Sequence, residues 1–176
     1  MAGIRQIGSR TIADVGFTRL DEVTIEAPDG STAVRYALRL ANAVAVVPLD
    51  GDDVILIEQY RSPIDQRLLE IPAGVLDIEG EEPEVAAARE LEEEIGFTPR
   101  SLLHLTDLIT SPGVVDEVIS IYLAEGVHHA DRKPVGPEER YADVHRMPLS
   151  EAIDLVHNGR IRDGKSIVGL LLAASR

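Results

Sequence analysis

The chain has 176 residues and a formal charge of −14, with 31 acidic and 17 basic side chains. This length suits one compact domain with at most a small addition, and an apolar fraction of 44% excludes a chain that is disordered throughout. Because the negative charge repels nucleic-acid phosphates and anionic lipid surfaces, we expect neither a nucleic-acid nor a membrane partner.

Two further features of the composition bear on location. The chain has no cysteine, which removes disulfides, zinc–thiolate sites and thiol nucleophiles and fits a reducing compartment. Residues 1–10 contain no apolar core of a signal peptide, and the longest late apolar run, residues 167–174, is too short to span a membrane. We therefore expect a cytoplasmic protein.

The first half of the chain is typical of strands followed by one helix. Residues 1–32 alternate weakly, and we interpret them as a small N-terminal β extension that could act as a dimerisation arm. The apolar runs 33–48 and 54–60 flank a polar turn and predict a hairpin, and residues 68–71 predict a short strand. Residues 83–95 predict a helix, because proline is tolerated at its first position and Gly96 can end it in a left-handed conformation.

The second half is typical of strands followed by two helices. Residues 101–109, 115–124 and 141–147 predict strands, and the proline-containing stretch 126–140 predicts a long exposed loop. Ser150 predicts the start of a helix running to about residue 157, and Ser166 predicts the cap of a last helix over residues 167–174. This order of elements indicates an α+β fold in which a mixed sheet is packed by helices.

The negative charge is concentrated around the predicted helix. Residues 77–94 contain nine acidic residues and only one basic residue, Arg89, so more than half of the net charge lies in this stretch. At 100° per residue, one side of the helix carries an apolar stripe and another side carries three acids. The stripe consists of Val85, Ala88, Leu91 and Ile95, and the acids are Glu90, Glu93 and Glu94.

The acidic side of the helix is a candidate cation site. Glu90 and Glu94 lie four residues apart, where like charges cost an isolated helix roughly 0.2–0.5 kcal/mol unless a cation lies nearby. Mg²⁺ prefers a few carboxylates together with waters and substrate phosphates. The alternative is a solvated helix face without a ligand, which spacing alone does not exclude.

The run from Gly74 to Phe97 resembles the signature of the Nudix hydrolases, Gly-x5-Glu-x7-Arg-Glu-U-x-Glu-Glu-x-Gly-U, in which U is a bulky apolar residue. Every fixed residue type from Glu81 to Phe97 is present. Six residues rather than five separate Gly74 from Glu81, which predicts a one-residue bulge in the loop that enters the helix.

This resemblance implies a fold, a cofactor and a set of ligands. The family fold is a mixed β-sheet sandwiched between helices, here expected over residues 33–176, and the cofactor is Mg²⁺, which Mn²⁺ can replace. The metal ligands implied are Glu90 and Glu94, with Glu93 as a ligand or a nearby acceptor and the carbonyl of Ala73 as a further ligand. In such motifs the arginine, here Arg89, more often forms a structural ion pair than contacts substrate.

Within the family, the ADP-ribose pyrophosphatases are most similar, over roughly residues 35–175. The similarity rests on the segments 58–61 and 69–74 and on Pro112, which lies sixteen residues after Gly96. It implies a nucleoside diphosphate substrate, cleavage of ADP-ribose to AMP and ribose 5-phosphate, and a homodimer formed through the N-terminal sheet.

The resemblance also implies residues that act on the substrate. A catalytic glutamate in the loop before the last strand corresponds to Glu138 first and to Glu139 second, and Glu93 is a further candidate for proton transfer. Arg61 is expected to hold a substrate phosphate. The turn residues Pro112 and Gly113 and the following Glu117 are expected to contact the substrate. For Arg61 and Glu117, a surface ion pair is the alternative.

One further motif and two alternative functions are compatible with parts of the sequence. Residues 159–166 match the P-loop pattern Gly-x4-Gly-Lys-Ser, but a predicted helix precedes them and only ten residues follow, so we interpret them as an interhelix turn. The first alternative function is hydrolysis of another nucleoside diphosphate derivative, such as GDP-mannose or a diadenosine polyphosphate. The second is a non-catalytic domain that senses a nucleotide, against which the intact glutamates argue.

Overall fold

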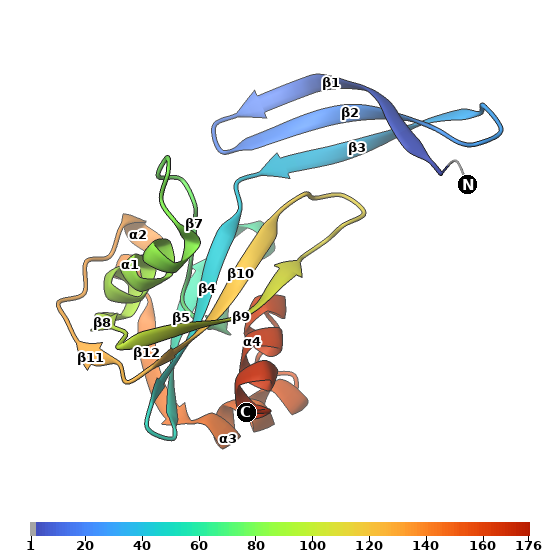
Figure 1. The fold of residues 1–176 in the computed structure, drawn as a ribbon. Helices are drawn as coiled ribbons and strands as arrows, with labels where there is room; N and C mark the ends of the chain where they lie inside the picture. The colour runs from blue at the N-terminus through green and yellow to red at the C-terminus, as the bar shows by residue number, and fades with distance from the viewer. Residues whose placement is uncertain (1–2) are drawn as a thin grey trace. The chain divides into compact units, whose positions relative to one another are not determined.

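The computed structural model describes residues 3–176, which form two compact units (Figure 1). The first unit comprises the described residues up to Asn42 together with Ile109–Val118. The second comprises Ala43–Leu108 and Ile119–Arg176.

A three-stranded antiparallel sheet makes up most of the first unit. Its strands, in spatial order, are β1 (Arg5–Val15), β2 (Thr18–Glu26) and β3 (Thr32–Leu40). Because β3 pairs with β2 over its whole length, this sheet continues beyond residue 32, where we expected the extension to end. Residues 109–118 join it through a bridge between Leu38 and Val115 and an ion pair of 3.1 Å between Arg39 and Asp116.

The second unit is built on a seven-stranded mixed sheet with the path β12-β5-β4-β10-β9, on which β6 pairs with β5 and β7 with β4. Strands β4 and β10 run parallel, whereas β4 and β5 form an antiparallel hairpin. A separate two-stranded sheet pairs β8 with β11. The strands are β4 (Ala43–Asp50), β5 (Asp53–Arg61), β6 (Gln66–Glu70), β7 (Ala73–Val75), β8 (Phe97–Thr98), β9 (Ser101–Ile109), β10 (Val118–Glu125), β11 (His128–His129) and β12 (Asp143–Pro148).

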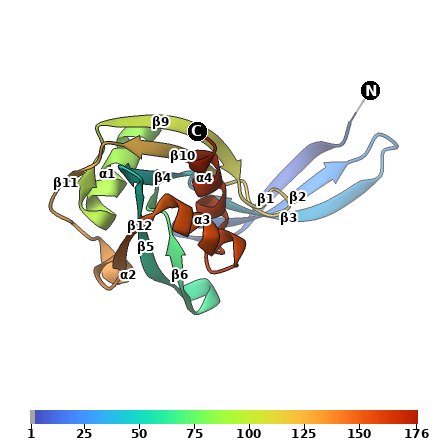
Figure 2. The same cartoon turned by 90° about the horizontal axis from the view of Figure 1, so that it is seen from below.

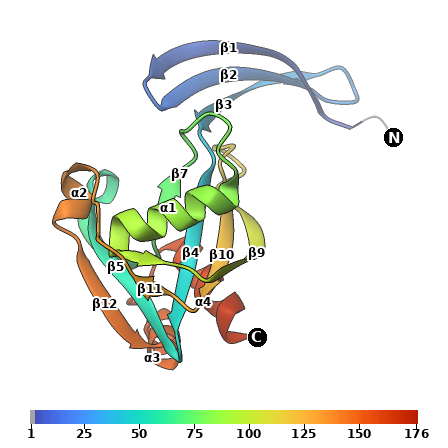
Figure 3. The ribbon, with the colours of Figure 1, turned by 60° about the vertical axis from the view of Figure 1, so that its left-hand side comes forward.

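Helices cover both faces of this sheet, as Figures 2 and 3 show. Alternate residues of β4 and β5 point to opposite faces, so one apolar cluster packs under α1 and another under α3 and α4. This arrangement confirms the predicted mixed sheet between helices. In residues 3–176 no helix has the length and apolar character that crossing a membrane needs. The helices are the 3₁₀ turn η1 (Ser62–Ile64), α1 (Pro83–Ile95), α2 (Gly136–Arg140), α3 (Leu149–His157) and α4 (Gly164–Ala174).

Several predicted boundaries were wrong. The stretch 126–140 is not wholly a loop, because it contains β11 and the short helix α2. Helix α3 begins at Leu149, with Pro148 at its N-cap and no side-chain cap, so Ser150 does not start it. Helix α4 is capped by Asp163, whose carboxylate accepts a hydrogen bond of 3.0 Å from the N–H of Ser166.

The faces of α1 also differ from the predicted stripe. Val85 is 58% exposed, whereas Glu90 and Glu94 are 8% and 3% exposed. The helix therefore turns Glu90 and Glu94 toward the body of the unit, beside Leu91, rather than toward solvent. The residues of α1 that are buried are Ala86, Ala87, Glu90, Leu91, Glu94 and Ile95.

The packing of α1 predicts a test of stability. Leu91→Ala should lower the free energy of unfolding by about 2–5 kcal/mol, because the fully buried side chain of Leu91 leaves a cavity. Val85→Ala on the exposed side of the same helix should change it by less than about 0.5 kcal/mol. Urea denaturation measures both values, and equal effects of the two substitutions would contradict the assigned face.

Candidate active site

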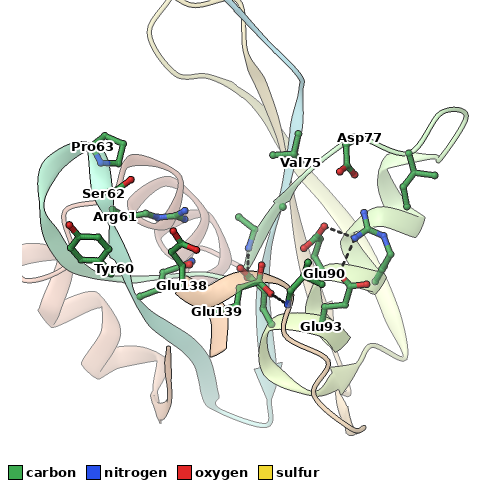
Figure 4. A pocket seen from close by; sticks show the side chains of 17 residues that line it. Tyr60, Arg61, Ser62, Pro63, Val75, Asp77, Glu90, Glu93, Glu138 and Glu139 are labelled. Carbon is green, nitrogen blue, oxygen red and sulfur yellow. Dashed lines mark hydrogen bonds and ion pairs between the residues drawn. The ribbon is translucent and has the colours of Figure 1, made fainter. Parts of the chain in front are cut away.

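A pocket of about 640 Å³ lies within the second unit, between β5, β7, α1 and α2 (Figure 4). Four stretches of chain that are distant in sequence supply its walls. The lining residues are Gln59, Tyr60, Arg61, Ser62, Pro63, Ala73, Gly74, Val75, Asp77, Ile78, Arg89, Glu90, Glu93, Glu94, Val135, Glu138 and Glu139. The structure thus brings together the predicted ligands of α1 and β7, the two loop glutamates and Arg61.

Glu94 is the most deeply buried acid of this pocket. One oxygen of its carboxylate, Oε2, accepts a hydrogen bond of 2.8 Å from the backbone N–H of Ala73. Burial raises the pKa of Glu94 to about 8, an effect that the Ala73 bond opposes and the charge of Glu90 adds to. Burial also raises the pKa of Glu90, although the cation of Arg89 opposes it.

Gly74 provides the room for the carboxylate of Glu90. A Cβ atom at this position would lie 1.9 Å from the Cδ of Glu90, so any larger residue displaces that side chain. Strand β7 holds Gly74 in place because it pairs with β4, where Gly74 lies opposite Val44. In this chain the close contact between Gly74 and Glu90 therefore requires a residue without a side chain at position 74.

Arg89 forms ion pairs with three glutamates at or beside the pocket. Its guanidinium forms ion pairs of 2.9 Å with Glu81, 2.7 Å with Glu90 and 3.1 Å with Glu93. These contacts agree with the structural ion pair expected for Arg89. The extra residue before Glu81 is taken up in a turn, in which Gly80 has a φ of 78°.

The two acids of α2 face different parts of the pocket. Figure 4 shows Glu138 on the side of Tyr60 and Arg61, and Glu139 on the side of Glu93. The carboxylate of Glu139 accepts a hydrogen bond of 2.6 Å from the N–H of Val135. Burial raises the pKa of Glu139, and the neighbouring charge of Glu93 adds to this effect.

Arg132, which sequence reasoning missed, ties the loop before α2 to α1. Its guanidinium donates hydrogen bonds of 2.5 Å to the carbonyl of Glu94 and 2.6 Å to the carbonyl of Glu139. Because both acceptors are backbone atoms, these bonds set the distance between α1 and α2. No local pattern in the sequence indicates such a contact, since Arg132 and Glu94 lie 38 residues apart.

Strand β5 supplies the cationic side of the pocket. Arg61 donates two hydrogen bonds to Glu70, of 2.8 Å from Nε and 2.6 Å from Nη2. Gln59, also missed as a site residue, is 2% exposed, and its side-chain nitrogen has no hydrogen-bond partner among residues 3–176. A buried donor without a partner is costly, so Gln59 offers an N–H that a ligand oxygen can satisfy.

The remaining predicted substrate residues lie in the first unit. Pro112, Gly113 and Glu117 belong to the stretch 109–118, and Glu117 accepts a hydrogen bond of 3.1 Å from Thr110. The residues that line the pocket all belong to the second unit. A role in substrate binding for these three residues stays a prediction.

The donors around the pocket fit a hard divalent cation. Glu90, Glu93, Glu94 and Glu139 supply only oxygen atoms, as Mg²⁺ and Mn²⁺ prefer. In the described part of the chain no three acidic, cysteine or histidine side chains are grouped so that they hold a metal ion in their present positions. Arg89 and backbone N–H groups engage the carboxylates instead. Burial raises the pKa values of Glu90 and Glu94, and a cation beside them would stabilise the ionised carboxylates.

Comparison with known proteins agrees with this geometry. A sequence model of the NUDIX domain matches residues 39–168. The methanol dehydrogenase activator of Bacillus methanolicus is 36% identical over 147 residues, which cover 83% of this chain and 79% of that protein. The ADP-ribose pyrophosphatase of Bacillus subtilis (strain 168) is 37% identical over 143 residues, which cover 81% and 77%. A solved ADP compounds hydrolase superposes with a TM-score of 0.88 at 26% identity, covering 99% of this chain and 94% of that one.

The burial of Glu94 predicts an unusual effect of Glu94→Gln on metal-free protein. The glutamine keeps an acceptor for the N–H of Ala73 and removes the buried charge, so the variant should melt at or above the wild-type temperature at pH 8. For wild type, the unfolded carboxyl ionises near its ordinary pKa of 4.5 and the folded one near 8, so stability falls as the pH rises between these values.

Thermal denaturation in chelator at pH 5 and pH 8 measures this effect. The advantage of Glu94→Gln over wild type should be larger at pH 8, where the folded wild type has begun to carry the buried charge. A variant that melts below wild type at pH 8 would contradict the assigned cost of burying Glu94.

Proposed function

Because the chain belongs to the NUDIX family, whose domain covers residues 39–168, we propose that it hydrolyses ADP-ribose to AMP and ribose 5-phosphate with the help of a divalent metal. The observation that carries this proposal is one pocket with buried acids on one wall and Arg61 on another. A diphosphate has the size and charge to bridge such walls. The similarity to an ADP-ribose pyrophosphatase and to an ADP compounds hydrolase supports the choice of ADP-ribose.

The metal proposed for this site is Mg²⁺, which Mn²⁺ can replace. Glu90 and Glu94 would hold it, with Glu93 and the carbonyl of Ala73 as further donors. When bound, the cation neutralises charge on the diphosphate oxygens and makes the attacked phosphorus more electrophilic. Among the described residues, Oε2 of Glu90 and Oε1 of Glu94 accept no hydrogen bond, so each carboxylate has an oxygen free for the cation while Arg89 and Ala73 keep their contacts.

Arg61 is suited to hold a phosphate oxygen. Glu70 engages Nε and Nη2 of its guanidinium, while Nη1 makes no hydrogen bond to the described residues. This leaves one end of a fixed, planar cation for the substrate. Guanidinium groups bind phosphate oxygens by charge-assisted hydrogen bonds.

Glu138 is the proposed general base. A water oxygen attacks one phosphorus of the diphosphate, its proton passes to the Glu138 carboxylate, and the bridging P–O bond breaks to release the two monophosphate products. Glu138 is favoured over Glu139 because the latter is held by the N–H of Val135 and lies toward Glu93. Glu139 is better suited to complete the acidic wall.

We extend the proposal to assembly and location. A homodimer would form through the three-stranded sheet of the first unit, and Pro112, Gly113 and Glu117 would contact the substrate in that assembly. Exposed apolar side chains on β1, on β3 and in the turn after β1 support an interface there. These are Ile7, Ile12, Val15, Phe17, Val34 and Tyr36. A cytoplasmic location fits the absence of cysteine.

A substrate panel tests the proposed activity. The purified protein with Mg²⁺ is assayed on ADP-ribose, GDP-mannose and a diadenosine polyphosphate, with product identification by chromatography and with a chelator control. ADP-ribose should have the highest kcat/KM, and chelator should abolish turnover. A higher kcat/KM for another compound would overturn the substrate, and no turnover of any compound would favour a nucleotide-sensing domain.

The roles of the two α2 acids predict different kinetic changes. Glu138→Gln should lower kcat by about 10²–10⁴-fold, because it removes the proton acceptor, and should leave the Mg²⁺ concentration for half-maximal rate unchanged. Glu139→Gln should mainly raise that Mg²⁺ concentration. Steady-state kinetics over a Mg²⁺ titration separates the two, and the reverse pattern would exchange their roles.

A further inference from the structure

The segment that resembles a P-loop has a place in the fold that the proposed function does not use. Its lysine, Lys165, lies in the first turn of α4 and is 8% exposed. The ammonium group of Lys165 lies 2.5 Å from Glu70 and 3.0 Å from Asp163. It is therefore engaged by two carboxylates inside the second unit and does not face a nucleotide.

Glu70 connects this lysine to the pocket. Its side chain is 1% exposed. Arg61 donates to both carboxylate oxygens, and Lys165 donates to Oε2, the oxygen that also accepts from Nη2 of Arg61. The four groups Arg61, Glu70, Lys165 and Asp163 form a chain with two positive and two negative charges. Only Arg61 of these four lines the pocket.

The position of Lys165 is set by close packing of α4 on the sheet. A Cβ atom at Gly169 would lie 2.9 Å from the side chain of Val47 and 3.0 Å from that of Ile71, so this glycine lets the helix approach. The hydroxyl of Ser166 accepts a hydrogen bond of 2.8 Å from the N–H of Ile71, the residue after Glu70. The first turn of α4 is thus fixed against the end of β6 that carries Glu70.

From these contacts we propose that Lys165 is a positioning residue for Arg61: it balances the charge of Glu70, so that Arg61 keeps its orientation and its attraction for a phosphate. The proposal rests on the proposed function, because it assigns the phosphate to Arg61. With Lys165 present, the four groups are neutral in sum. Without it, Arg61 faces the buried carboxylate of Glu70 and the partly buried one of Asp163, and the cluster beside an anionic substrate carries a net charge of −1.

The charge balance predicts that two substitutions act differently on KM for ADP-ribose. Lys165→Met should raise KM for ADP-ribose about tenfold or more with kcat changed less than about threefold, because ground-state and transition-state binding weaken together. Asp163→Asn removes a negative charge, and asparagine keeps the cap of α4. KM in this variant should therefore stay at or below the wild-type value.

The matched control is Lys133→Met, at the only other lysine of the chain. Lys133 pairs with Glu92 at the surface, away from this cluster, so its removal should leave KM within about twofold of wild type. A double-mutant cycle adds a second readout: in an Arg61→Ala background, Lys165→Met should have no further effect on KM. A merely structural role would instead lower kcat or stability in both backgrounds.

All variants are first checked for wild-type thermal denaturation, and the assay uses the full chain with Mg²⁺. A KM for Lys165→Met within twofold of wild type would overturn the proposal, as would a raised KM in Asp163→Asn. If Lys165→Met does not fold, the sign of the Asp163→Asn effect decides. If wild type hydrolyses no compound of the panel, the proposed function fails independently of the role of Lys165. Calorimetric titration with ADP then tests that role: Lys165→Met should bind ADP more weakly than wild type, and Asp163→Asn should not. The reverse result would overturn the proposal.

Discussion

Two carboxylates, of Glu90 and Glu94, are buried between helix α1 and the backbone of strand β7, and the pocket is organised around the cost of keeping them there. A carboxylate that leaves water loses solvation that protein groups must replace. Here the N–H of Ala73 and the guanidinium of Arg89 replace part of it, and burial still raises the pKa of both carboxyls. A divalent cation is the group that would supply it.

Close packing of α1 on the sheet and on β7 keeps the two carboxylates buried. Leu91, between the two acids in sequence, is fully buried and ties α1 to the sheet. Strand β7 brings a backbone N–H to Glu94 and a residue without a side chain to Glu90. The opposite wall is cationic, with Arg61 held by Glu70 and Glu70 by Lys165. A diphosphate between the walls would meet Arg61 on one side and the proposed divalent cation on the other, although the chain as a whole is strongly acidic.

Much of this architecture could be predicted from sequence because its signals are local. Pro83 and Gly96 mark both ends of α1, and the resemblance of the run from Gly74 to Phe97 to the Nudix signature, rather than the spacing of the glutamates alone, predicts a cation site. The order of strands and helices predicts the correct fold class, and the comparison with the NUDIX domain confirms the family.

The rest of the site depends on contacts between distant residues. Lys165 and Glu70 lie 95 residues apart, and Arg132 and Glu94 lie 38 apart, so no periodicity reveals either pair. The helical wheel assigns Leu91 to an apolar stripe and Glu90 and Glu94 to an acidic one, but the structure buries all three side chains. The wheel gives the side of the helix on which a residue lies and not the part of the protein that covers this side. Serine is common at the N-cap of helices, so the sequence predicts this role for Ser166. In the structure its hydroxyl instead accepts a hydrogen bond from the N–H of Ile71.

The central claim is that the buried carboxylates of Glu90 and Glu94 bind a divalent cation, and proton release on metal binding tests it most directly. Calorimetric titration of the protein with Mg²⁺ at pH 7, in buffers of different ionisation enthalpy, counts the protons released. Because burial raises the pKa of Glu94 to about 8, binding should release about one proton, and fewer as the pH rises to 9. Binding without proton release at pH 7, or no binding, would contradict the account.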